Sequence, residues 1–132
     1  MSTRHTAGPW RWEVNLKSRR VGLCGGNPRF DLSVMDFTRW GTQGAAPEFR
    51  EDVDRMEIMR RCEKWAVPVP GREHHAHWLQ TLSHPDALLI QAAPDLLGAL
   101  KELRDAPWLT MPGRANDIVE AAIARAEKGA TP

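Results

Sequence analysis

The sequence predicts an α+β fold in which a small antiparallel sheet near the N-terminus packs against helices near the C-terminus. Apolar and polar side chains alternate over residues 10–14, which is typical of a half-buried strand. Turn-forming residues cluster at 17–20 and 25–28, and beyond residue 84 apolar side chains recur at helical spacing. Strands followed by helices, rather than alternating with them, indicate an α+β fold instead of a doubly wound one.

The sheet is expected to be a three-stranded meander over about residues 9–37. Its first strand places Trp10 and Trp12 on one face, residues 21–24 return as the hairpin partner, and residues 30–37 form the third strand. Both tryptophans therefore belong to the predicted core, where they supply much apolar area.

The middle of the chain gives weaker signals. Residues 38–47 are rich in glycine and are expected to be irregular. From Val53 to Cys62 apolar side chains recur every third position, which predicts a helix over residues 51–65.

The C-terminal part is expected to hold helices separated at a proline. Ser83 and Asp86 resemble a capping box. Pro94 predicts a break or kink at Ala93, because its ring clashes with the carbonyl four residues earlier. A final helix is expected over about residues 116–128. The predicted common core joins both regions: Trp10, Trp12, Leu96, Leu97, Leu100, Ile118 and Ile123.

Length and composition indicate one soluble domain over residues 1–132, with flexible ends at 1–8 and 129–132. A net charge of +1 provides no global attraction for nucleic acid. The two cysteines form no disulfide framework, and no apolar run reaches the ~18 residues that a membrane helix needs. A cytosolic protein with no membrane partner is expected.

Three segments carry a family resemblance. The opening His5-Thr6-Ala7-Gly8-Pro9-Trp10 resembles the His-Thr-Pro-Gly-Pro-Trp start of small phage and prophage proteins of unassigned role, with alanine at position 7. Residues 85–97 resemble the usual ending of these proteins, and residues 34–41 are similar to a central block in some of them. The resemblance implies a phage origin and the host bacterial cytoplasm as location, but no reaction.

One candidate site is the run Glu73-His74-His75-Ala76-His77. His75 and His77 are placed to chelate zinc or another divalent metal from one side of an extended segment. Further ligands after folding would come from Cys24, Cys62, Asp31 or Asp36. The spacing matches no established zinc signature, and a solvated polar loop is the favoured alternative.

A second candidate site combines cationic and aromatic side chains in the basic half of the chain. Arg19, Arg20 and Arg39 would hold phosphate groups, and Trp40 would stack on a base. Trp40 lies beside the glycine-rich segment and outside the alternating core positions, so it is the tryptophan least needed for folding.

Two classes of function follow. The favoured hypothesis is a phage accessory protein without a catalytic centre or cofactor, which inhibits a bacterial antiviral defence system by binding a host defence protein or a small nucleotide signal. The alternative is a small metal-dependent hydrolase or nuclease built on residues 73–77. Exposed sheet edges also predict a homodimer, formed either through an edge strand or through the apolar helices.

Overall fold

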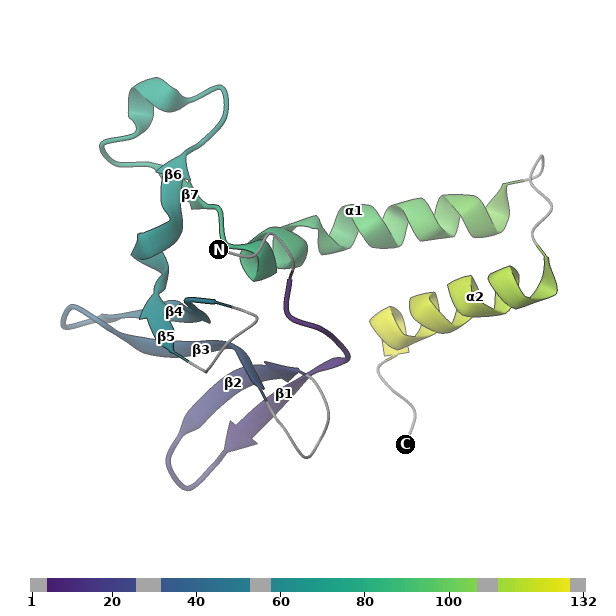
Figure 1. Cartoon of the computed structure of the whole chain (residues 1–132), viewed down its shortest axis with the longest axis horizontal. Helices are drawn as coiled ribbons and strands as arrows, with labels where there is room; N and C mark the ends of the chain where they lie inside the picture. Colours follow the sequence, from purple (N-terminus) through teal and green to yellow (C-terminus); the bar gives the residue numbers. More distant parts are fainter. Residues whose placement is uncertain (1–4, 26–31, 53–57, 107–111, 129–132) are drawn as a thin grey trace. The chain divides into compact units, whose positions relative to one another are not determined.

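The computed structural model describes residues 5–25, 32–52, 58–106 and 112–128 (Figure 1). The chain divides into two compact units, Met1–Leu89 and Ile90–Pro132. The long helix α1 begins in the first unit and continues through the second. Each unit is described by itself below.

The first unit is built on an antiparallel meander in which each strand pairs with the next along the chain. The meander confirms the predicted α+β class and contains the three expected strands, with two more added. Its strands are β1 (Trp10–Asn15), β2 (Arg20–Gly25), β3 (Leu32–Trp40), β4 (Gly44–Arg50) and β5 (Met59–Arg61).

The two additional strands correct the predictions for the middle of the chain. Residues 38–47 are not irregular: Gly41, at a φ of 69°, reverses the chain so that Trp40 pairs with Gly44. The helix predicted for residues 51–65 is also wrong in its described part, because Met59–Arg61 pairs with β4 and Cys62–Trp65 forms the short 3-10 helix η1. Pairing with a neighbouring strand overrides the local apolar period here.

A two-stranded ribbon follows, formed by β6 (Ala66–Pro68) and β7 (Gln80–Leu82). The loop between them contains a second 3-10 helix, η2 (Glu73–His75), and projects at the upper left of Figure 1. Backbone N–H groups of Gly71 and Glu73 donate to the Glu73 carboxylate and lower its pKa. The predicted polar loop is therefore exposed but ordered by local hydrogen bonds.

The apolar core of the first unit lies where β4, η1 and the start of α1 meet. Ala46, Phe49, Cys62 and Trp65 are buried, and Met35, Leu82 and Ala87 pack against them. The predicted common core is therefore wrong in part. Trp12 is 59% exposed, because β1 and β2 form a hairpin at the edge of the sheet. Of the other predicted core residues, Ile123 is buried, three are half-buried and two are exposed: Trp10, Leu97 and Leu100 are half-buried, and Leu96 and Ile118 are exposed.

A buried polar network joins the N-terminal segment, the end of β4 and the start of α1. Thr6 donates to the Asp86 carboxylate twice, from its backbone N–H at 2.5 Å and from its hydroxyl at 2.6 Å. The Arg50 guanidinium in turn donates to the Thr6 hydroxyl at 2.6 Å. Thr6 thus bridges two charged groups that are both fully buried, which compensates their loss of hydration.

His84, rather than Ser83, caps helix α1. Its Nδ1 accepts from the backbone N–H of Asp86 at 3.0 Å, so the ring proton lies on Nε2, which donates to the Arg50 carbonyl at 2.8 Å. The ring also stacks on Phe49 and meets the edge of Trp65. Burial lowers the pKa of His84, and the cap requires the neutral form.

The second unit is a pair of helices, the later part of α1 (Pro85–Asp105) and α2 (Gly113–Lys128). Of the break or kink that Pro94 predicts, the break is wrong, because α1 continues through this residue as one helix. Pro94 has no N–H to donate to the Ile90 carbonyl, and both residues lie on the exposed side of the helix. The last helix is confirmed and begins three residues earlier than expected.

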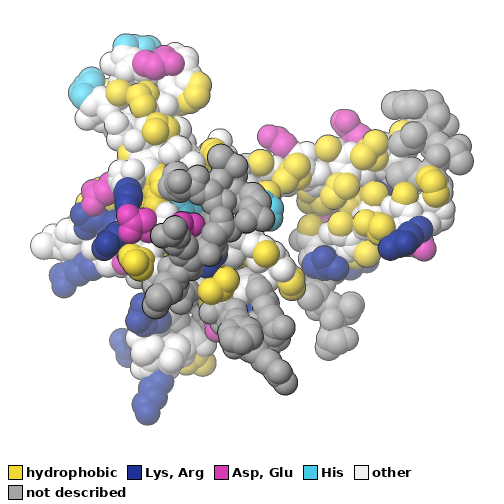
Figure 2. All heavy atoms as spheres, viewed as in Figure 1, with side chains coloured by type: hydrophobic (Ala, Val, Ile, Leu, Met, Phe, Trp, Pro, Cys, Tyr) yellow, Lys and Arg dark blue, Asp and Glu magenta, His cyan; other side chains and the backbone are white. Residues whose placement is uncertain are grey.

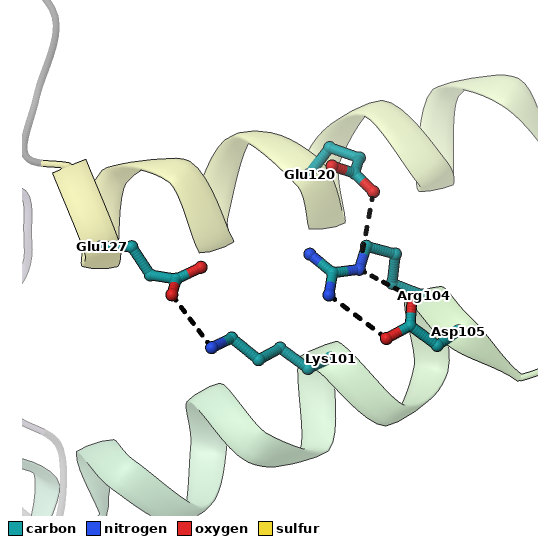
Figure 3. A network of polar contacts seen from close by, with 5 residues as sticks. All are labelled: Lys101, Arg104, Asp105, Glu120 and Glu127. Carbon is teal, nitrogen blue, oxygen red and sulfur yellow. Dashed lines mark hydrogen bonds and ion pairs between the residues drawn. The ribbon is translucent and has the colours of Figure 1, made fainter.

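Charged side chains link the two helices (Figure 3). Lys101 donates to Glu127 at 3.0 Å, and Arg104 lies 3.9 Å from Glu120 while it also bonds Asp105. These groups are largely solvated, so each pair contributes little to stability. Within the described residues, neither helix is long and apolar enough to cross a membrane.

The bridging role of Thr6 predicts a specific loss of stability. Thr6→Val removes the hydroxyl and leaves Asp86 Oδ2 and an Arg50 N–H buried without their partner, so the free energy of unfolding should fall by about 1–3 kcal/mol. Urea denaturation measures this. Thr38→Val, the same change in a half-buried strand position, should cost less than ~0.5 kcal/mol. Equal losses in both variants would refute the bridge.

The neutral His84 cap predicts acid sensitivity. The pKa is lower in the folded state, so the unfolded chain binds the proton first and stability falls as the pH drops below the unfolded value of ~6.5. Thermal melts at pH ~7.5 and ~5.5 measure this fall. His84→Asn keeps a capping side chain that does not titrate. This variant should be less stable than the unaltered protein at pH ~7.5, but its melting temperature should fall less between the two pH values. An identical pH dependence in both proteins would contradict the assignment.

Candidate functional site

The most distinctive surface feature of the first unit is a groove of about 520 Å³ between the end of β3 and the β6–β7 ribbon. We call it the Trp40–Trp78 groove after the two tryptophans on its walls. Its walls are mainly apolar and come from β3, β4, η1, the ribbon and the loop. They are formed by Trp40, Pro47, Cys62, Glu63, Ala66, Ala76, His77, Trp78, Gln80, Thr81 and Leu82.

Trp40 reaches the groove because it ends β3, immediately before the turn at Gly41. Its side chain is 47% exposed, in agreement with the prediction that it lies outside the core. The Arg61 guanidinium lies 5.4 Å from the centre of the indole ring, a distance suited to a cation–π contact. Arg61 also donates to Glu63 at 2.5 Å, which keeps its charge beside the groove.

Trp78 lies in the loop before β7 and is 60% exposed. Its ring is 4.9 Å from that of His75 and 6.2 Å from that of His77, measured between centroids. The Arg72 guanidinium lies 5.9 Å from the indole centre. The histidines that the sequence singled out therefore surround an exposed tryptophan.

The groove walls suit binding better than covalent chemistry. Cys62 is the one thiol on them, and it is buried, which raises its pKa and disfavours the reactive thiolate. Gln80 and Thr81 add polar groups to otherwise apolar walls. Aromatic faces with a few polar groups are typical of binding sites for flat ligands and peptide segments.

The described residues assemble no metal centre around His75 and His77. Among the described residues, no group of three or more His, Cys, Asp or Glu side chains is arranged to hold an ion. His77 and Cys62 line the same groove, whereas Cys24 and Asp36 line a different one, and Asp31 lies outside the described residues.

The predicted cationic residues do not join Trp40 in one site. Arg19 lies in the β1–β2 turn, and Arg20 forms an ion pair with Asp36 at 3.6 Å beside an open groove of about 660 Å³ over β1–β3. Arg39 precedes Trp40 in β3, so its side chain leaves the opposite face of the strand. In Figure 2 several Lys and Arg side chains lie on the hairpins, and a group of histidines lies at the tip of the β6–β7 loop.

Sequence reasoning missed Trp78 and Arg61. Trp78 directly follows the histidine run, and a large apolar residue in a polar loop was the available signal. Nothing local marks Arg61, because its position over Trp40 depends on the pairing of β4 with β5.

Comparison with known families identifies the chain as a phage protein. It belongs to the family described as Salmonella phage P22 protein Y8K6, whose profile matches residues 1–131. The resemblance noted in the opening and closing segments is thereby confirmed, and the family has no assigned function. No curated protein and no solved structure matches the chain significantly.

The buried network gives the resemblance a physical meaning. Thr6 belongs to the opening segment and Asp86 to the closing one, and the two side chains bond directly in the interior. The residues that carry the family resemblance are thus partly those that hold the first unit together.

Proposed function

We propose that this protein is a phage accessory protein that acts by binding, with the Trp40–Trp78 groove as its binding surface. The observation that carries the proposal is the exposure of two tryptophans on the walls of one groove. Large aromatic side chains left in water cost free energy, and they are the residues that most often dominate binding interfaces. Because the family is a phage family, we expect the protein to act in the host bacterial cytoplasm.

The target that we favour is a host protein of an antiviral defence system, which the phage protein inhibits by occupying a surface. Tryptophan and arginine are the residue types enriched at interface hot spots. Trp40 and Trp78 line the groove, and the guanidinium groups of Arg61 and Arg72 lie over their rings. A net charge of +1 argues against a nucleic-acid surface, whose affinity rests on many phosphate contacts.

A small nucleotide signal is the second candidate target. Its support is the pairing of each exposed indole with a guanidinium, since stacking and charge together bind bases and phosphates. The groove volume of about 520 Å³ lies in the range of small-molecule sites. The metal-dependent hydrolase has less support, because the described residues present no set of three ligands.

Substitution of the groove tryptophans tests the proposal. Trp40→Ala and Trp78→Ala should each weaken binding to a host partner about thirtyfold, the loss typical of a hot spot, while thermal stability changes little. The measurement is affinity capture from phage-sensitive host cells, followed by titration of the purified partner. For a nucleotide target, fluorescence titration should show at least a fivefold loss of affinity in each variant, which is approximately the contribution of one stacked base.

Leu103→Ala provides the matched control, because Leu103 is 45% exposed and lies on α1 outside the groove walls. It should leave the affinity unchanged. A partner that binds all three variants as it binds the unaltered protein would refute the groove as the binding surface. A melted Trp40→Ala or Trp78→Ala protein would place that side chain in the core instead.

A further inference from the structure

The two edges of the five-stranded sheet differ in how they are protected. β5 has only three residues, two of them arginines, which is a usual defence against pairing with another chain. β1 has six residues and pairs only with β2 among the described strands. β1 also exposes Trp12 and Val14, at 59% and 61%. This edge has the length and composition of a pairing surface.

The two faces of β1 are chemically distinct. Trp10, Trp12 and Val14 alternate along one face, and Arg11 and Glu13 lie on the other with their charged groups 2.7 Å apart. Opposite charges two residues apart on one face make the strand complementary to a reversed copy of itself.

We propose that β1 pairs antiparallel with β1 of a second copy of this chain, with Trp12 opposite Trp12. In this register Arg11 of each copy lies opposite Glu13 of the other, which places two opposite-charge pairs on one face. On the other face each Trp10 lies opposite a Val14, so aromatic and β-branched side chains cover one another across the two-fold axis.

Charge selects this register over its neighbours. The face of every side chain is preserved only when the register shifts by an even number of residues. A shift one way places Arg11 opposite Arg11, and a shift the other way places Glu13 opposite Glu13. Like charges directly opposite each other are destabilising, so both alternatives are disfavoured.

The dimer leaves the Trp40–Trp78 groove open in both copies, because no residue of β1 or β2 lines that groove. The assembly therefore carries two target-binding sites. A partner with two epitopes binds the dimer more tightly than one copy, because the second contact forms within the same complex at a high effective concentration. The pairing does not depend on what the groove binds.

Charge reversal tests the pairing. The unaltered protein should have a dimer mass in sedimentation equilibrium at micromolar concentration. Arg11→Glu and Glu13→Arg should each weaken the dimer at least tenfold, because each places like charges in both cross-strand pairs. An equimolar mixture of the two variants should dimerise again. Lys17→Glu, in the exposed turn, is the matched control and should remain dimeric.

Thiol crosslinking tests the register independently of the charges. In a background without Cys24 and Cys62, Trp12→Cys should crosslink to itself through a short bis-maleimide, since directly opposite Cβ atoms lie ~5 Å apart. Val14→Cys should not, because the two copies of position 14 lie four residues or ~13 Å apart. A monomer mass for the unaltered protein, or a Val14→Cys crosslink stronger than that of Trp12→Cys, would overturn the proposal. Circular dichroism confirms that each variant is folded.

Discussion

The contact on which the first unit most depends is the bond between Thr6 and Asp86. It connects the segment before β1 to the first turn of α1. Arg50 at the end of β4 adds a third contact, because its guanidinium donates to the Thr6 hydroxyl. The Asp86 and Arg50 side chains are both fully buried here, so burial of each one is tolerable only while Thr6 and the other side chain remain in place. Arg50 Nε and Nη1 have no hydrogen-bond partner among the described residues, which leaves the Thr6 bridge as the main compensation for this charge.

This constraint also positions the groove. His84 precedes Asp86, caps α1 and inserts its ring between Phe49 and Trp65, so the helix start is locked into the apolar core. The backbone N–H and the hydroxyl of Ser83 both donate to the Trp65 carbonyl, which fixes the base of the β6–β7 ribbon. The ribbon in turn carries Trp78 and its loop. The buried network around Thr6 and Asp86 thus helps to position the exposed aromatic walls of the Trp40–Trp78 groove.

The sequence predicted the elements that are determined by residues close together in the chain. It missed the strands and contacts that depend on residues far apart in the chain. Period-two alternation located β1 and β3, the turn residues between them indicated β2 as the hairpin partner of β1, and helical spacing located α2. β4 was hidden because Gly44-Ala45-Ala46-Pro47 has little strand propensity, and it exists through its register with β3. His84 lies seven residues after the exposed histidine run, but it is a core residue because it packs on Phe49 and Trp65. Of the residues on the groove walls, the sequence pointed to Trp40, Cys62 and His77, but it did not predict that they share one groove with Trp78.

A double-mutant cycle on Arg50 and Asp86 tests most directly whether the buried network acts as a unit. Free energies of unfolding are measured by urea denaturation for Arg50→Met, Asp86→Asn and the double variant. Each single change removes one of the two buried charged side chains that Thr6 bridges and leaves the remaining one without the opposite charge. The double variant should therefore lose less free energy of unfolding than the sum of the two single losses. The expected coupling is about 1–3 kcal/mol. Losses that add to within ~0.5 kcal/mol would contradict the account, because they would show that the two groups act independently.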